Sequence, residues 1–146
     1  QEILTIKPFM MQKYLIDTNI LIELMRKNQS ILRKFAETGI ENCAVSFYSL
    51  CELYYGAYHI KDKTYQSEEL NKINVIRNKF TVISTMTNAE EFGQIKANLY
   101  AAGKKVDDMD ILIGSLAVAN GMTVVTDNEK HFSRMPSIKC ENWLER

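Results

Sequence analysis

The feature that most constrains the fold is an alternation of short apolar runs with longer segments of helical periodicity. The apolar runs lie at residues 13–16, 43–45, 80–83 and 123–125, and their length suits buried strands. Between them, apolar residues recur every three or four positions, as they do on the packed face of a helix. Strands that alternate with helices predict an α/β sandwich with a mainly parallel sheet.

The boundaries of the helices follow from capping residues and from the ends of the periodic segments. Helices are predicted from residues 17–19 to Met25, over 31–36, from a cap at Ser46 to Ala57, over 64–77, from 87 to about 103, and over 111–119. The stretch 87–90 has the spacing of a capping box, and Asn120-Gly121 is a typical helix end. Residues 138–140 are expected to form a last edge strand.

The length and composition of the chain fit one domain. It has 146 residues, 46% of them hydrophobic, with only two prolines and six glycines, which leaves little room for a disordered linker. No apolar run approaches the roughly 18 residues that cross a bilayer, and no signal peptide is recognisable, so no membrane association and a cytoplasmic location are expected. Residues 1–10 are interpreted as a leader or an added extension, and residues 11–146 as the domain.

Charge and cysteine usage exclude some classes of function. The 18 basic and 18 acidic residues give zero net charge, which argues against a protein that coats nucleic acid but leaves an enzyme that grips a few phosphates. The three cysteines are widely spaced and form no C-x-x-C pair, so we expect them to be reduced and mostly buried. His59 and His131 stand in no nucleophile motif and are interpreted as surface histidines.

Four acidic residues are placed where a parallel sheet gathers its ligands. Asp17 and Asp127 each follow a predicted strand, and ligands of such sheets bind beyond the carboxyl ends of the strands. Asp110 lies in the first turn of a buried helix, and Glu52 lies about two turns into another helix. Carboxylates gathered at one edge repel each other unless a cation neutralises them, and Mg²⁺ or Mn²⁺ prefers such oxygen ligands. The sequence leaves open whether one ion or two would bind.

Each acid also has a simpler interpretation. Asp17 can serve only as a helix cap, and Asp107, Asp108 and Asp110 can all favour one helix N-terminus. Glu52 can be an exposed helix charge, and Asp127 with Asn128 can form a plain turn. A site is therefore indicated only by all four acids together.

These motifs resemble the PIN-domain family, in particular VapC-like toxins of bacterial toxin–antitoxin pairs. The resemblance runs from Met11 almost to the C-terminus, and it is carried by residues 14–21, 46–56, 108–114 and 123–132. One departure is Gly114-Ser115, where the family usually has two alanines, and it is interpreted as a conservative packing change.

The resemblance implies a three-layer α/β/α sandwich and a Mg²⁺- or Mn²⁺-dependent endoribonuclease. It implies an RNA substrate, with transfer RNA as one candidate, inhibition by a cognate antitoxin, and a homodimer. Transferred to this sequence, the catalytic and metal-binding acids are Asp17, Glu52, Asp110 and Asp127. Thr18, Thr126 and Asn128 would support these carboxylates or a water, and Asp108 would be an auxiliary acid.

Cations and aromatic residues flank these motifs. Eight cations are candidates for phosphate contacts, although for any one of them a solvated surface charge is the favoured interpretation: Lys104, Lys105, Lys130, Arg134, Arg26, Lys27, Arg33 and Lys34. The tyrosine-rich stretch 53–58 is a candidate for the antitoxin groove or a dimer contact, or for ordinary core packing.

Two rival functions are weighed against a nuclease. A catalytically idle PIN-like module that binds RNA or protein is expected to lack one of the acids. A metal-dependent phosphatase or a phospho-accepting receiver domain is the other. A receiver needs an acceptor aspartate after a middle strand, and the strand ending at Ile83 has none.

Overall fold

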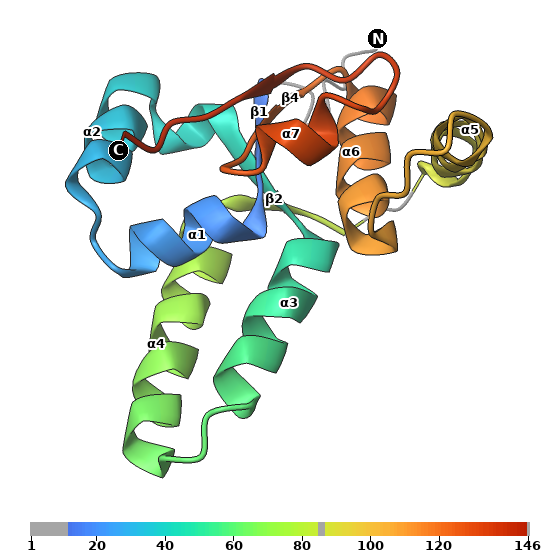
Figure 1. Ribbon diagram of the computed structural model, residues 1–146. Helices are drawn as coiled ribbons and strands as arrows, with labels where there is room; N and C mark the ends of the chain where they lie inside the picture. The colour runs from blue at the N-terminus through green and yellow to red at the C-terminus, as the bar shows by residue number, and fades with distance from the viewer. Residues whose placement is uncertain (1–11, 85–86, 146) are drawn as a thin grey trace, which may run out of the picture.

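The computed structural model describes residues 12–84 and 87–145 and shows an α/β/α sandwich (Figure 1). The strands are β1 (Tyr14–Ile16), β2 (Cys43–Ser46), β3 (Thr81–Ile83), β4 (Thr123–Val125) and β5 (Cys140–Glu141). The helices are α1 (Thr18–Met25), α2 (Gln29–Thr38), η2 (Ile40–Asn42), α3 (Phe47–Tyr58), α4 (Lys63–Lys79), α5 (Ala89–Ala101), α6 (Asp108–Asn120) and α7 (Glu129–Phe132). The predicted leader, residues 1–10, lies outside the described residues.

The sheet has the order β3-β2-β1-β4-β5, and all its strand pairs are parallel. The expected mainly parallel sheet is confirmed. The central strand is β1, whereas β3, which ends at Ile83, lies at an edge of the sheet. The missing aspartate after Ile83 is therefore no argument against a receiver domain, because the acceptor would follow a middle strand. Receiver domains are excluded instead by topology, because their strand order is 2-1-3-4-5.

Alternate residues of each strand point to two separate cores, one on each face of the sheet. Ile16, Val45 and Val125 pack with α1 to α4, whereas Leu15, Ala44 and Val124 pack with α5, α6 and α7. Both faces of the sheet are therefore covered, which confirms the three-layer arrangement.

Helices α3 and α4 extend from the sandwich as an antiparallel pair, which we call the arm (Figure 1). Ser46 caps α3 by accepting a hydrogen bond from the Ser49 amide, as predicted. Across the described part of the chain, no helix has the length and apolar character needed to span a bilayer.

Three local predictions are wrong. The capping box at residues 87–90 is absent, because Asn88 occupies the cap position of α5 and its side chain is engaged elsewhere. The last strand is residues 140–141 rather than 138–140. The cysteines are not mostly buried, since Cys43 is buried, Cys140 is half-buried and Cys51 is exposed.

The buried Asn88 side chain connects three helices. Its amide group donates to the Leu112 carbonyl oxygen at 3.2 Å and to the Ser115 hydroxyl at 2.8 Å, both in α6. Its oxygen accepts from the Tyr48 hydroxyl of α3 at 3.3 Å. Ser115 therefore makes a specific polar contact, and a Cβ added at Gly114 would lie 2.6 Å from the Met135 sulfur. An alanine at 115 would lose this hydrogen bond, and a Cβ at 114 would require the flexible Met135 side chain to shift, so Gly114-Ser115 differs from two alanines by a polar contact as well as by packing.

Candidate metal centre

The candidate site lies where the strand order reverses. From β1 the chain proceeds to β2 and β3 on one side, and β4 lies on the other side of β1. In open parallel sheets, such a reversal point opens the crevice in which ligands bind. Asp17 follows β1 directly, and Thr126 and Asp127 follow β4.

Asp17 is only 4% exposed, and both of its carboxylate oxygens accept hydrogen bonds. Oδ1 accepts from the Thr18 amide at 2.8 Å, and Oδ2 accepts from the Thr126 hydroxyl at 2.8 Å. Burial raises the pKa of Asp17 to about 6, and the charges of Asp110 and Glu52 add to this rise against the two hydrogen bonds. Asp17 does cap α1, but a cap alone explains neither the burial nor the neighbouring acids.

Glu52 approaches the same place from α3. The Thr18 hydroxyl donates a hydrogen bond to its Oε1 atom. Burial raises the pKa of Glu52, and the charges of Asp110 and Asp107 raise it further. Glu52 is therefore not simply an exposed helix charge.

Asp110 lies in the first turn of α6, as predicted, and it contacts His131 of α7. The Nδ1 atom of His131 lies 3.3 Å from Asp110 Oδ2 and 2.7 Å from Nδ2 of the Asn128 side chain. Burial raises the pKa of Asp110, and Asp107 adds to the rise, while the hydrogen bond and charge of His131 oppose it. The interpretation of His131 as a lone surface histidine is wrong, whereas His59 is exposed and stacks on Tyr55.

Asp127 is tied to the site through a chain of hydrogen bonds. Its backbone amide donates to Asn19 Oδ1 at 3.1 Å, and its Oδ1 accepts from the Asn142 side chain at 3.1 Å. The side-chain nitrogen of Asn19 lies 3.5 Å from the Thr126 hydroxyl, which itself donates to Asp17. The backbone amide of Asn128 donates to the same hydroxyl at 2.9 Å, so residues 126–128 form a defined arrangement around it.

The structure separates two acids that the sequence left together at the start of α6. Asp108 is exposed and pairs with Lys96 of α5 at 3.0 Å, so it is directed away from the other carboxylates. Asp107 is not among the residues that the family resemblance implies. Its charge nevertheless raises the pKa of both Glu52 and Asp110. Helical spacing could have indicated this difference between the two acids. Asp107 lies three positions from Asp110, on the same side of the helix, whereas Asp108 lies two positions away and faces elsewhere.

The donor atoms fit a hard divalent cation. Asp17, Glu52 and Asp110 offer carboxylate oxygens, and burial raises the pKa of each, with a further rise from neighbouring acidic charges. Within residues 12–84 and 87–145, no three acidic, histidine or cysteine side chains are close enough to hold an ion together. A Mg²⁺ ion does not need such a cage, because it keeps several waters and commonly takes one or two protein carboxylates.

Comparisons with known proteins identify the family of this chain. A sequence profile described as PIN domain matches residues 14–138. Ribonuclease VapC2 of Haemophilus influenzae is 32% identical over 136 residues, covering 92% of this chain and 100% of that protein. The tRNA(fMet)-specific endonuclease VapC of Salmonella typhimurium is 30% identical, covering 91% of this chain and 99% of that protein.

Solved structures give the same result. A chain of DNA-bound VapBC from Salmonella typhimurium superimposes with a TM-score of 0.82 at 30% identity, covering 92% of this chain and 100% of that one. VapBC2 from Rickettsia felis, bound to a DNA fragment from its promoter, gives 0.81 at 27% identity and covers 91% and 100%. The chain therefore belongs to the PIN-domain family, within the group of VapC ribonucleases.

Proposed function

We propose that this protein is an endoribonuclease that hydrolyses RNA phosphodiester bonds with Mg²⁺ or Mn²⁺, and that it is the toxin of a toxin–antitoxin pair. The observation that carries the proposal is the group formed by buried Asp17 and half-buried Glu52 and Asp110 at the reversal point of a PIN fold, where burial and neighbouring acidic charges raise the pKa of each carboxyl group. Similarity over nearly the whole length of named VapC ribonucleases supports it. An idle PIN-like module is disfavoured, because none of the four expected acids is missing.

In this proposal, four carboxylates hold the cation directly or through water: Asp17, Glu52, Asp110 and Asp127. Bound Mg²⁺ or Mn²⁺ would supply an activated water and stabilise negative charge on the phosphodiester. Thr18, Thr126 and His131 each fix one carboxylate by a hydrogen bond, so the acids are oriented before the substrate arrives. Asn128 supports this arrangement through Thr126, whose hydroxyl accepts from the Asn128 backbone amide.

The RNA must approach an acidic site, so nearby cations are proposed to bind its phosphates. Lys104 and Lys105 are exposed just before α6, and Lys130 is exposed in α7. Arg26 and Arg33 are weaker candidates, because they pair with Glu23 and Glu145. Substrate binding should therefore weaken with salt, and replacing Lys104 or Lys130 should reduce that salt dependence.

Transfer RNA is the proposed substrate class, since one relative is named as a tRNA(fMet)-specific endonuclease. The test is incubation of total RNA with the purified protein, with Mg²⁺ or with EDTA, followed by mapping of the cut ends. Asp110→Asn should abolish cleavage, whereas Asp108→Asn, two residues away but paired with Lys96, should retain most of it. Cleavage by Asp110→Asn at the wild-type rate would refute the assignment.

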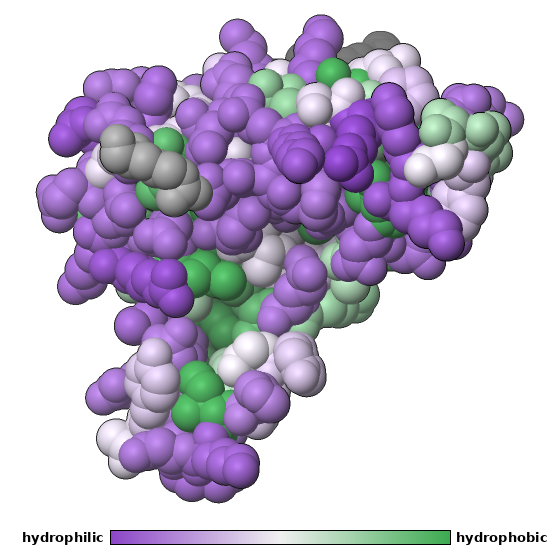
Figure 2. Space-filling model, viewed as in Figure 1, coloured by the Kyte–Doolittle hydropathy of each residue, from purple (hydrophilic) through white to green (hydrophobic). Residues whose placement is uncertain are grey.

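The proposed antitoxin site is the hollow between α1 and the arm, which Figure 2 shows lined with hydrophobic residues. Its lining includes Ile22, Met25, Leu53 and Ala57, and Glu52 lies at its border. A partner segment in this hollow would lie beside the candidate metal centre and could obstruct it. Gly56 also lines it, and a Cβ there meets no atom within 4 Å, so Gly56→Arg should leave cleavage intact and weaken inhibition by the antitoxin.

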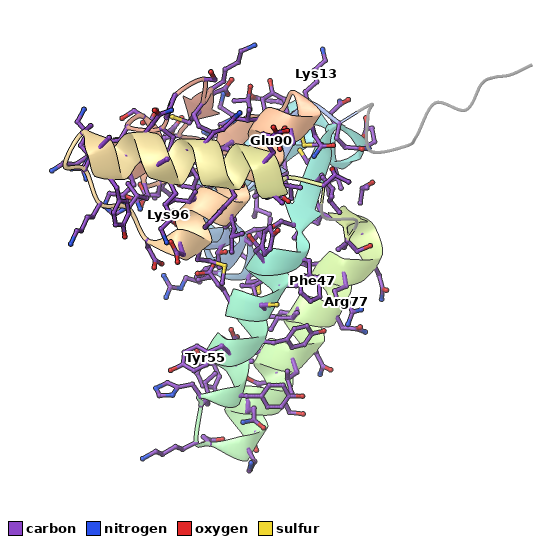
Figure 3. All side chains as sticks on the ribbon, turned by 90° about the vertical axis from the view of Figure 1, so that its right-hand side faces the viewer. Lys13, Phe47, Tyr55, Arg77, Glu90 and Lys96 are labelled. Atoms are coloured by element: carbon purple, nitrogen blue, oxygen red, sulfur yellow. The ribbon has the colours of Figure 1, made fainter. Side chains whose placement is uncertain are left out.

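The proposed dimer contact is the outer face of α3. Tyr55 and Tyr58 are 71% and 63% exposed and Phe47 is 49% exposed, so these rings are not ordinary core residues. Figure 3 shows Phe47 and Tyr55 along α3, with Arg77 on the adjacent α4. Phe47→Asp should shift the protein toward the monomer in analytical ultracentrifugation, and an unchanged mass would remove this face from the proposal.

A further inference from the structure

The segment after the last strand reaches back to the candidate metal centre through Asn142. The Nδ2 atom of Asn142 donates to Asp127 Oδ1 at 3.1 Å. Its Oδ1 atom accepts from the Leu144 backbone amide at 2.9 Å. Because the oxygen is held by a backbone donor, the orientation of the amide is defined and its nitrogen faces the carboxylate.

This segment is anchored in the core rather than laid on the surface. Trp143 is 3% exposed, and its ring makes edge contacts with Tyr14 at 5.3 Å and Phe35 at 5.2 Å. Its indole nitrogen donates to Glu141 at 3.0 Å, and the Glu145 amide donates to the Ser30 hydroxyl at 3.2 Å. Asn142 is thus fixed by buried neighbours on its C-terminal side.

Asp127 is held from the opposite side by its own backbone. Its amide donates to Asn19, which stands two residues after Asp17 in α1. One asparagine therefore fixes the main chain of Asp127, and the other fixes one oxygen of its carboxylate. Since Asn142 contacts Oδ1, the rotation of the carboxylate is restricted, and Oδ2 has a defined direction.

We propose that Asn142 is a positioning residue that orients Asp127 for the divalent cation. The inference rests on the proposed metal-dependent function and adds a residue to it from outside the matched PIN profile, which ends at residue 138. Groups that hydrogen-bond to metal-binding carboxylates fix their geometry and commonly alter metal affinity by 10- to 100-fold when removed.

The test compares Mn²⁺ affinities in the absence of RNA, measured from the electron paramagnetic resonance signal of free Mn²⁺. Asn142→Ser keeps an oxygen that can accept from the Leu144 amide but is too short to reach Asp127. We expect it to weaken Mn²⁺ binding roughly tenfold while leaving the melting temperature in EDTA close to that of the wild type. Ser30→Ala, which removes the Glu145 contact and the hydroxyl's bond to Asn28 but leaves Asn142 and Asp127 unchanged, should leave Mn²⁺ affinity unchanged.

A double-mutant cycle shows whether Asn142 acts through Asp127. In an Asp127→Ala background, Asn142→Ser should have no further effect on Mn²⁺ affinity. An equal loss in both backgrounds, or no loss in either, would overturn the proposal. If RNA is cut but Mn²⁺ affinity depends on neither residue, the positioning role fails and the activity stands. Coupled Mn²⁺ binding without RNA cleavage would support the positioning role and refute the proposed ribonuclease activity.

Discussion

Replacing Asp17 by asparagine should stabilise the metal-free protein at neutral pH. A rise of the Asp17 pKa from 3.8 to about 6 makes its ionised form about 3 kcal/mol less favourable in the folded protein than in the unfolded chain. Asparagine has the shape of the carboxyl group and resembles its protonated form, with one accepting oxygen and one donating group. The Asp17→Asn variant therefore avoids the free-energy cost of holding a buried negative charge. Its hydrogen bonding should match that of the protonated Asp17 side chain.

The sign and the pH window follow from proton binding. Between pH 3.8 and about 6 the folded protein binds more protons at Asp17 than the unfolded chain does, so wild-type stability falls as pH rises through this range. The difference between variant and wild type should be only about 0.5 kcal/mol at pH 4 and should reach about 3 kcal/mol in favour of the variant at pH 7.5.

Urea unfolding in EDTA at a series of pH values measures this difference. Glu68→Gln removes one negative charge from an exposed position in the arm, and it should change the free energy of unfolding by no more than about 0.5 kcal/mol. A stability difference for Asp17→Asn that does not vary with pH, or that favours the wild type at pH 7.5, would show that burial does not penalise the ionised form of Asp17.

Three further predictions test the surroundings of the site. Mg²⁺ or Mn²⁺ at 100 times its dissociation constant should stabilise the wild type by about 2.7 kcal/mol, and calorimetry should show a smaller gain for Asp17→Asn. Thr126→Val keeps the shape of a fully buried side chain but removes the donor to Asp17 and the acceptor for the Asn128 amide, so it should lower the free energy of unfolding by about 1–3 kcal/mol. Asn88→Ala removes three side-chain hydrogen bonds between helices and should lower it by about 2 kcal/mol, whereas no loss in urea unfolding would mean that water replaces them.

The sequence predicts the position of the site because that position depends on local patterns. Each short apolar run identifies a strand, and in a parallel sheet the residues after the strands share one edge. The placement of Asp17 and Asp127 after β1 and β4, and of Asp110 in the first turn of α6, follows from these patterns alone. That Asp17, Glu52, Asp110 and Asp127 are the catalytic and metal-binding residues remains a prediction.

The sequence does not predict contacts between elements that are distant along the chain. Asn88 looks like part of a capping box because Thr87 and Glu90 stand beside it, yet its side chain bonds to residues 24 and 27 positions away. His131 and Asp110 are 21 positions apart, and no motif connects them. In each case a tertiary partner decides what the side chain does, and the local pattern does not indicate that partner.

The start of α6 shows how the fold distributes negative charge. Three acids at one helix N-terminus are favoured by the helix dipole, but the dipole stabilises such charges only by about 0.3–1 kcal/mol each. Lys96 pairs with Asp108, and its ammonium group also lies over the rings of Phe92 and Tyr100, so this carboxylate is neutralised within the protein; Figure 3 shows Lys96 on α5. Asp107 and Asp110 have no lysine or arginine among the ion pairs of the described residues, and their charges act on the site instead. The repulsion between Asp107, Asp110 and Glu52 is therefore retained on the side of α6 where a bound cation would relieve it. On the other side of α6, Lys96 neutralises Asp108, whose charge would otherwise only destabilise the fold.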